Sequence, residues 1–258
     1  MTVTSFHSTE RFDAVDALRG LAMVWMTAFH FCFDLNQFGY WKQNFYNDPL
    51  WTWQRTLIVS LFLFCAGMGQ AIALAQAQSW PRFWRRWVQV LLCALLVSLG
   101  SWWMYPQSFI YFGVLHGIAL MLIIVRLTAR WGNWLWLLGG VAIVAQFVAA
   151  YALDTTAMAG LADALNAPAL NWLGLITRKP ITEDYVPLLP WLGVMWWGVA
   201  AGRSWPGRAG PHWSGKFPAG LIKPLAALGR WSLSYYMLHQ PVMIGALMAV
   251  AWLLQRYS

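Results

Sequence analysis

Long apolar stretches separated by short polar segments dominate the pattern along the chain. Each stretch is close to the roughly 20 residues that a helix needs to cross the hydrocarbon core of a membrane. The stretches cover residues 14–36, 54–77, 85–104, 109–127, 132–152, 187–203 and 231–254. The pattern therefore predicts an all-α integral membrane protein, a bundle of about seven transmembrane helices that forms a single domain over residues 1–258.

The composition agrees with this interpretation. Hydrophobic residues make up 60% of the chain and charged residues only 10%, which a soluble domain of this length would hardly tolerate. Many of the twenty tryptophans lie near the ends of the predicted helices, where aromatic side chains favour the membrane interface. The three cysteines fall within predicted helices and lack the spacing of a metal site, so we interpret them as small core residues.

Basic residues predict the orientation, because loops rich in Lys and Arg stay on the cytoplasmic side. With the N-terminus in the cytoplasm and the C-terminus outside, twelve of the seventeen basic residues lie on the cytoplasmic side. The twelve are Arg11, Arg19, Arg82, Arg85, Arg86, Arg126, Arg130, Arg203, Arg208, Lys216, Lys223 and Arg230. The net charge of +8 is thus a topology signal, and we expect no nucleic-acid partner.

Two longer connections join the predicted helices. The inner one, residues 204–230, is rich in Gly, Pro and basic residues and is predicted to be a loop. The outer one, residues 153–186, is long enough to act as a lid or a substrate rim, although a plain connector is an equally reasonable interpretation.

The first predicted helix carries ionisable side chains at helical spacing. Such a side chain at the centre of a membrane helix costs about 2.5 to 3.5 kcal/mol and so indicates a function. At about 100° per residue, Arg19 and His30 lie about 20° apart around the axis, and Asp34 lies about 40° further. Asp34 could hold one nitrogen of His30 and leave the other as a base. Alternatively, Asp34 lies at the interface and His30 bonds a neighbouring helix.

Two further histidines lie within predicted helices. His116 follows YFGVL, with Gly113 and Gly117 close by to permit helix approach. His239 shares a polar stripe with Ser232 and Tyr235. Each alone is more often a hydrogen-bonded core histidine, but together with His30 they favour a common polar cavity.

A compact basic cluster opens the third predicted helix. After Pro81, which suits a helix start, Arg82, Arg85 and Arg86 project at positions i, i+3 and i+4. Guanidinium groups beside a helix N-terminus form a strong phosphate site. Positive-inside anchoring explains the same residues without a ligand.

Several segments resemble the membrane-bound acyltransferases. DALRGLAMVWMTAFHF resembles their first helix, SLFLFCAGMG their second, and Arg82 and Arg86 their basic RxxxR motif. HFCFDL, YFGVLH, DYVPLLPWLGV and GRWSLSYYMLHQP are similar to bacterial members of the heparan-alpha-glucosaminide N-acetyltransferase catalytic-domain family. The resemblance implies transfer of an acetyl group from cytoplasmic acetyl-CoA to an extracytoplasmic sugar. It also implies that His30 is the catalytic imidazole and that Arg82 and Arg86 bind the nucleotide phosphates.

We therefore predict an acyl-CoA-dependent O- or N-acetyltransferase of the bacterial inner membrane, with acetyl-CoA as donor, a sugar or glycan as acceptor, and no metal. A homo-oligomer remains open. The predicted catalytic residues are His30, Asp34 and His116. The predicted donor-binding residues are Arg19, Arg82, Arg85, Arg86 and His239. Asp184 and Tyr185, at the outer end of the sixth predicted helix, are the candidates for acceptor contacts.

Two other functions fit part of the pattern. The three intramembrane histidines could be axial ligands of a haem in a b-type electron carrier. Alternatively, His30 and Asp34 could relay protons in a transporter, although the chain lacks the matched, interrupted halves that are typical of that class.

Overall fold

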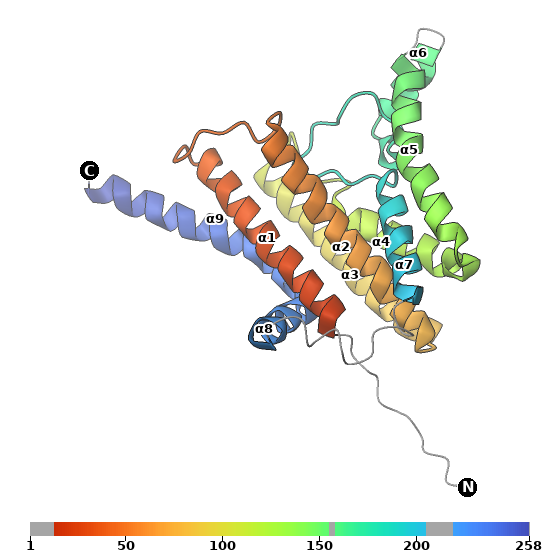
Figure 1. The fold of residues 1–258 in the computed structure, drawn as a ribbon. Coiled ribbons are helices and arrows are strands. Elements are labelled where there is room, and N and C mark those ends of the chain that lie inside the picture. The colour runs from red at the N-terminus through yellow and green to blue at the C-terminus, as the bar shows by residue number, and fades with distance from the viewer. Residues whose placement is uncertain (1–12, 155–157, 205–218, 258) are drawn as a thin grey trace.

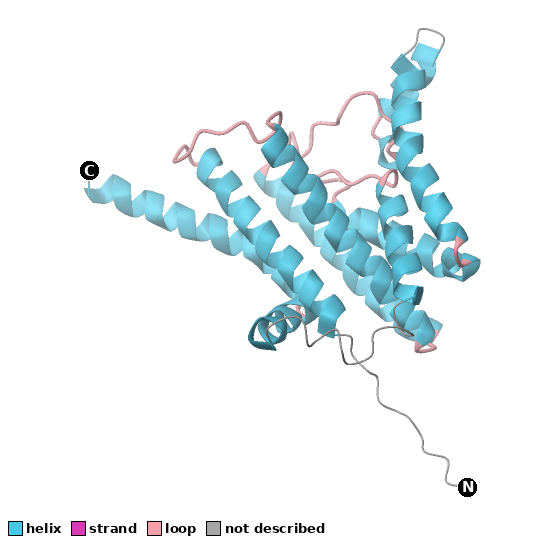
Figure 2. Ribbon diagram, in the orientation of Figure 1, coloured by secondary structure: helices cyan, strands magenta, loops and turns pink. Residues whose placement is uncertain are grey.

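The computed structural model describes residues 13–154, 158–204 and 219–257, and these residues fold into helices and connecting loops without an extended strand (Figures 1 and 2). The helices run from one end of the bundle to the other and back. In chain order they are α1 (Asp13–Gln37), α2 (Pro49–Ala75), α3 (Trp80–Met104), α4 (Val114–Thr128), η1 (Ala129–Trp131), α5 (Trp134–Asp154), α6 (Ala159–Asn166), η3 (Asn171–Leu173), α7 (Trp191–Ser204), α8 (Ala219–Arg230) and α9 (Ser232–Tyr257). The all-α prediction is confirmed.

Each of the seven predicted stretches forms a helix, but several helices begin or end at residues other than those predicted. Helix α2 begins earlier, at Pro49, because the Asp48 carboxylate accepts the Leu50 N–H and caps the helix. Helix α4 begins later, at Val114, because the residues before it are extended and Phe112 pairs with Tyr185. Helix α7 starts at Trp191, directly after Pro190.

Five helices of the described chain are long and apolar enough to cross a membrane: α2, α3, α4 with η1, α5 and α9. Helix α1 has 25 residues but carries charged side chains, and α7 has only 14 residues, about 21 Å of helix. The count of seven spans and the orientation therefore remain predictions. Three residues used to predict the orientation, Arg11, Arg208 and Lys216, lie outside the described residues.

The prediction that residues 204–230 form a loop is wrong for their second half, where α8 lies. The helix accommodates Pro224 in its middle and packs against the first turns of α1. A Cβ on Gly229 would lie 1.8 Å from the Asp16 carbonyl oxygen, and one on Gly20 would lie 2.0 Å from that of Leu225. Close backbone packing at two glycines thus outweighs the poor helix propensity of this segment.

Helices α2 and α7 form the most extensive helix pair and fix the centre of the bundle. A Cβ on Gly67 would lie 2.1 Å from the Met195 carbonyl oxygen, and one on Gly198 would lie 2.2 Å from that of Phe64. Small residues let two backbones approach this closely in membrane proteins. The contact therefore depends on glycine at both positions.

Two apolar clusters fill the interior. The larger joins α2, α3, α4, α5 and α7 around Leu63, Met121 and Met195, and the smaller joins α1 and α2 around Met26 and Trp51. By contrast, most apolar side chains of α3, α5 and α9 are exposed, as expected of helices that face lipid. The three cysteines are free thiols, and the prediction of core residues is confirmed for Cys65, which is fully buried, whereas Cys32 and Cys93 are only half-buried.

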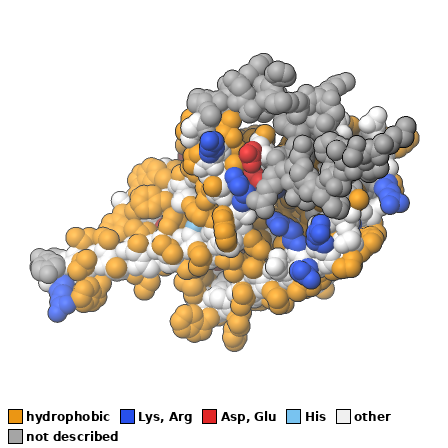
Figure 3. Space-filling view, turned by 90° about the horizontal axis from the view of Figure 1, so that it is seen from below, with side chains coloured by type: hydrophobic (Ala, Val, Ile, Leu, Met, Phe, Trp, Pro, Cys, Tyr) orange, Lys and Arg blue, Asp and Glu red, His pale blue; other side chains and the backbone are white. Residues whose placement is uncertain are grey.

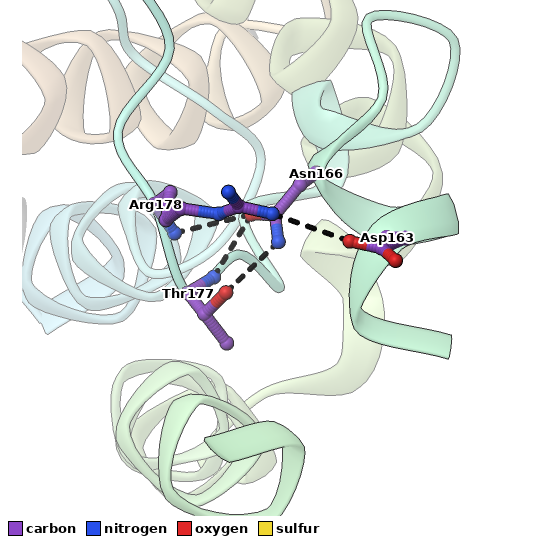
Figure 4. A network of polar contacts seen from close by, with 4 residues as sticks. All are labelled: Asp163, Asn166, Thr177 and Arg178. Atoms are coloured by element: carbon purple, nitrogen blue, oxygen red, sulfur yellow. Dashed lines mark hydrogen bonds and ion pairs between the residues drawn. The ribbon is translucent and has the colours of Figure 1, made fainter. Parts of the chain in front are cut away.

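The connection after α5 is ordered over its described residues. The Asn166 side chain accepts the backbone N–H groups of Thr177 and Arg178 and donates to the Thr177 hydroxyl, while Arg178 pairs with Asp163 at 3.2 Å (Figure 4). These contacts tie the end of α6 to the loop that leads to α7. The two interpretations of this segment, a plain connector and a lid, both stay predictions.

One end of the bundle carries several basic side chains. The lower end in Figure 1 contains the start of α1, the α2–α3 turn, the end of α4 and helix α8, and we call it the basic end. Viewed from below, it shows several Lys and Arg side chains and little acidic surface (Figure 3). The opposite end carries the loops at residues 38–48, 105–113 and 167–190, and we call it the loop end.

We expect the substitution Gly198→Ala to destabilise the protein by about 3 kcal/mol or more, because the new methyl group would meet backbone rather than a movable side chain. Thermal unfolding of the purified protein in detergent measures the loss. Gly140→Ala is the matched control, since a Cβ on Gly140 meets nothing within 4 Å. Equal melting temperatures for the two variants would contradict the proposed packing of α2 on α7.

Candidate functional site

A cavity of about 320 Å³ opens between α1, α2, α3, α4 and α9. Arg19 and Arg86 lie at its basic end, together with the amide side chains of Gln70 and Gln78. Further in, the walls are apolar and include Val114, Leu115, Ile118, Leu122, Phe62 and Met23. The cavity thus combines a cationic, amide-lined end with an apolar interior.

The structure separates the predicted donor-binding arginines into two groups. Arg19, which pairs with Asp16 at 3.0 Å, and Arg86 both line the cavity although they come from different helices. Arg82 and Arg85 are exposed and do not line it. Of the two residues in the RxxxR motif, only Arg86 therefore faces this space.

A row of polar pairs joins α1 to α9 beyond the cavity. The hydroxyls of Thr27 and Tyr235 lie 2.6 Å apart, the ring centroids of His30 and His239 lie 5.3 Å apart, and Gln240 Nε2 donates to Asp34 Oδ1 at 2.7 Å. We call these six residues the α1–α9 seam. They follow both helices in register, so the predicted stripes on α1 and α9 do face each other.

The seam contains several buried acceptor atoms with no hydrogen-bond partner among the described residues. They are Asp34 Oδ2, His239 Nε2 and Gln240 Oε1. Asp34 is only 3% exposed and His239 only 9%. Because buried polar atoms are usually paired, three such acceptors close together favour a site that binds a ligand with N–H or O–H donors.

The tautomer of His239 follows from its hydrogen bond. Its Nδ1 lies 2.8 Å from the Tyr236 carbonyl oxygen, and a carbonyl can only accept, so Nδ1 carries the proton. In the neutral ring Nε2 then bears a free lone pair. His239 was predicted to bind the donor, but its position beside His30 makes it part of an imidazole pair.

The cavity does not reach His30. Its lining ends at Tyr236, whose ring lies 5.7 Å from that of His239. On α1, Arg19 and Met23 line the cavity, and His30 lies on the same face eleven residues beyond Arg19, about 16 Å along the axis. One aromatic side chain and the buried Met26 therefore separate the basic cavity from the seam.

Asp34 does not orient His30 as the sequence suggested. Its carboxylate is directed to α9, where the amide of Gln240 is the hydrogen-bond partner. Asp34 lies about 40° around the helix axis from His30. Its carboxylate therefore faces Gln240, the residue that follows His239 on α9. Asp34 thus contributes to the seam through Gln240.

His116 lies at the loop end, in the first turn of α4, and its ring has two hydrogen bonds. Nδ1 accepts the Gly113 N–H at 3.3 Å, so Nε2 is the atom that donates to the Ser98 hydroxyl at 3.0 Å. These bonds favour the hydrogen-bonded core alternative over a catalytic role. Gly117 does permit a close approach, but of the loop at Val186 rather than of another helix.

The two predicted acceptor-binding residues make contacts within the protein. Asp184 Oδ2 accepts the Val114 N–H at 2.7 Å and caps α4, and the Tyr185 hydroxyl donates to the Asn171 carbonyl at 2.6 Å. Burial raises the pKa of Asp184, although the Val114 N–H counteracts this, and burial also raises the pKa of Tyr185. Since Val114 lines the cavity, Asp184 lies just behind its inner wall.

Sequence reasoning missed Thr27, Gln240 and Tyr236. Thr27 and Gln240 are polar residues inside predicted membrane helices, a signal that was available but weaker than that of an ionisable side chain. Tyr236 gave no signal, because only the fold shows that it ends the cavity.

The haem alternative meets a geometric obstacle. The rings of His30 and His239 are in edge contact, which leaves no space for a haem plane between them, and both ring nitrogens of His116 are engaged. Within the described residues, no group of three His, Cys, Asp or Glu side chains could hold a metal ion.

A helical bundle with five helices apolar enough to span a membrane, among the described residues, is typical of a membrane protein, and it contains a cavity with a basic end and an imidazole pair beyond it. The family of heparan-alpha-glucosaminide N-acetyltransferase catalytic domains matches residues 11–241. The chain belongs to this family, which confirms the resemblance seen in the sequence and suggests a transmembrane acetyltransferase. No curated protein and no solved structure matches significantly.

The seam makes a prediction about α9. Thr27→Ala and Tyr235→Phe should each destabilise the protein, and the double variant should lose less than the sum, with a coupling energy of about 0.6 to 1.7 kcal/mol. Unfolding in detergent measures all four proteins. The control is a second double-variant cycle that combines Thr56→Ala with Tyr235→Phe, because the Thr56 hydroxyl bonds within α2. A Thr27–Tyr235 coupling no larger than the control would show that this pair does not join α1 to α9.

Proposed function

We propose that this protein transfers an acetyl group from acetyl-CoA, bound at the basic end, to a hydroxyl or amine of a sugar or glycan that arrives from the loop end. The basic end faces the cytoplasm of a bacterium, and the bundle of seven spans lies in the inner membrane. One observation carries the proposal: the cavity leads from Arg19 and Arg86 to Tyr236, which contacts His239 of the imidazole pair.

The cavity suits the two parts of the donor. The phosphates of coenzyme A match the guanidinium groups of Arg19 and Arg86, since Arg forms forked hydrogen bonds to phosphate. Arg82 and Arg85, exposed at the start of α3, attract the same anion to the entrance. The apolar interior then accepts the pantetheine arm, which points the thioester toward Tyr236 and the seam.

His30 is the general base in this proposal, and the transfer is direct. Its imidazole removes the proton of the acceptor hydroxyl or amine while the oxygen or nitrogen attacks the thioester carbonyl carbon. The carbon–sulfur bond breaks, and the proton passes from the imidazolium to the sulfur, so that coenzyme A leaves as a thiol. His239, whose free lone pair lies beside His30, stabilises the imidazolium through a shared proton.

The unpaired acceptors of the seam support binding of the sugar. Asp34 Oδ2 and Gln240 Oε1 are buried and can accept from its hydroxyl or ammonium groups. Asp184 and Tyr185 support the acceptor site from behind. Asp184 holds the start of α4, and Tyr185 holds the loop at Asn171. His116 positions α4 through its bonds to Gly113 and Ser98.

His30→Ala should lower kcat for acetyl transfer by at least roughly a hundredfold, since general-base catalysis contributes about that much. The Kd for coenzyme A should stay within about twofold, because His30 lies outside the cavity. Purified protein in detergent, radiolabelled acetyl-CoA and an amino-sugar acceptor give both values. A His30→Ala enzyme with unchanged kcat would remove His30 from the mechanism. Protein that retains the label without acceptor would replace direct transfer with an acyl-imidazole.

Arg86→Ala should weaken coenzyme A binding by roughly ten- to a hundredfold, the loss expected for a charge-assisted hydrogen bond. The double variant Arg82→Ala with Arg86→Ala should bind no more than slightly worse, because Arg82 does not line the cavity. Lys223→Ala, an exposed residue on α8, is the control for loss of one positive charge. Unchanged affinity in the double variant would exclude this cavity as the donor site.

A further inference from the structure

Arg126, in the last turn of α4, is a buried cation without a carboxylate partner. It is only 7% exposed. The ion pairs within the described residues join Arg19 to Asp16, Arg178 to Asp163 and Arg230 to Asp13, and none includes Arg126. Removing an unpaired guanidinium from water is costly, so its environment requires an explanation.

The known contacts of Arg126 satisfy it only in part. Nη2 donates to the Gln78 carbonyl oxygen, and the guanidinium carbon lies 5.2 Å from the Trp80 ring and 5.4 Å from the Phe83 ring. Cation–π contacts offset some of the lost hydration. Nη1, however, is buried with no partner among the described residues. The N–H groups on Nη1 of Arg126 therefore donate to no described residue.

The surroundings of this unused donor place it beside the cavity. Gln78 and Phe83, two of the three residues that contact Arg126, line the cavity, and Arg126 lies behind them without lining it. The side-chain oxygens of Gln70 and Gln78 are likewise buried without partners among the described residues. Residues of the cavity lining at the basic end are thus in contact with the Arg126 guanidinium.

Aromatic side chains extend from this point along α3. Phe83 and Trp87 line the cavity, and Trp80, Phe83, Trp84 and Trp87 form a continuous series of ring contacts. These groups suit a nucleotide, because aromatic rings can stack on its base, a guanidinium can donate to its phosphates, and the unpaired amide oxygens can accept from its base amine or its ribose hydroxyls.

We propose that Arg126 is a phosphate ligand for the nucleotide end of the acyl donor, with Gln70 and Gln78 as its neighbours in the same subsite. This inference rests on the proposed function, since it assumes a coenzyme A donor. With Arg126 as a ligand, the enzyme would bind a thioester of coenzyme A, which carries a nucleotide, more tightly than a thioester of pantetheine alone. Arg126 then adds a third guanidinium to those of Arg19 and Arg86 for the donor's phosphates.

The test measures binding of coenzyme A, 3′-dephospho-coenzyme A and pantetheine to the full-length protein in detergent, by calorimetry. Arg126→Gln keeps a donor for the Gln78 carbonyl but loses the charge. It should weaken coenzyme A binding by roughly tenfold or more and leave pantetheine binding within about twofold. If the 3′-phosphate is the ligand, wild type should prefer coenzyme A over the dephospho form and the variant should not. If Arg126 binds the diphosphate instead, Arg126→Gln should bind coenzyme A and 3′-dephospho-coenzyme A more weakly by the same factor.

Arg130→Gln is the matched control, because Arg130 is an exposed arginine one turn further along the chain. Its binding of all three ligands should stay within about twofold of wild type. Equal losses in the two variants, or unchanged coenzyme A binding in Arg126→Gln, would overturn the inference. If Arg126→Gln does not fold, Arg126→Lys decides, since it keeps the charge and should lose affinity through its missing fork.

The outcomes separate the two proposals. Wild-type protein that binds none of the nucleotides would contradict the proposed function itself. Coenzyme A binding that depends on Arg86 and not on Arg126 would leave the proposed function standing and overturn only the role of Arg126.

Discussion

Polar groups inside a membrane must find partners within the protein, and the α1–α9 seam meets this requirement in part, because three of its buried acceptor atoms have no partner among the described residues. Helix α9 is mostly exposed to the surroundings, and apolar packing therefore gives it little hold on the bundle. Hydrogen bonds such as Thr27 with Tyr235 and Asp34 with Gln240 supply part of that hold. Because the same contacts bring His30 to His239, the chemistry of the site and the attachment of α9 depend on one set of interactions.

How far the sequence predicts the fold depends on the kind of signal. Apolar length predicts the helices well, since the membrane allows few other structures. It fails at α8, where packing against Gly20 and Gly229 decides the outcome. Charge patterns locate Arg19, Arg86 and His30, because a charge in lipid is costly wherever it occurs.

The pairing of side chains could not be predicted, since it depends on how helices distant in sequence face each other. Periodicity places Asp34 near His30, but it cannot show that Gln240 takes the carboxylate. The same limit applies to the basic residues. Arg126 contributes to the orientation signal exactly as an exposed arginine does, and only the fold shows that its guanidinium is buried beside Gln78.

The position of Tyr236 has a consequence for the membrane itself. A membrane protein with an internal cavity risks opening a leak for protons, which would dissipate the electrochemical gradient. In this structure the water-accessible space that enters from the basic end stops at an aromatic ring rather than continuing to the imidazoles. The described residues therefore close this path to protons, and only a movement of Tyr236 would connect the cavity to the imidazoles.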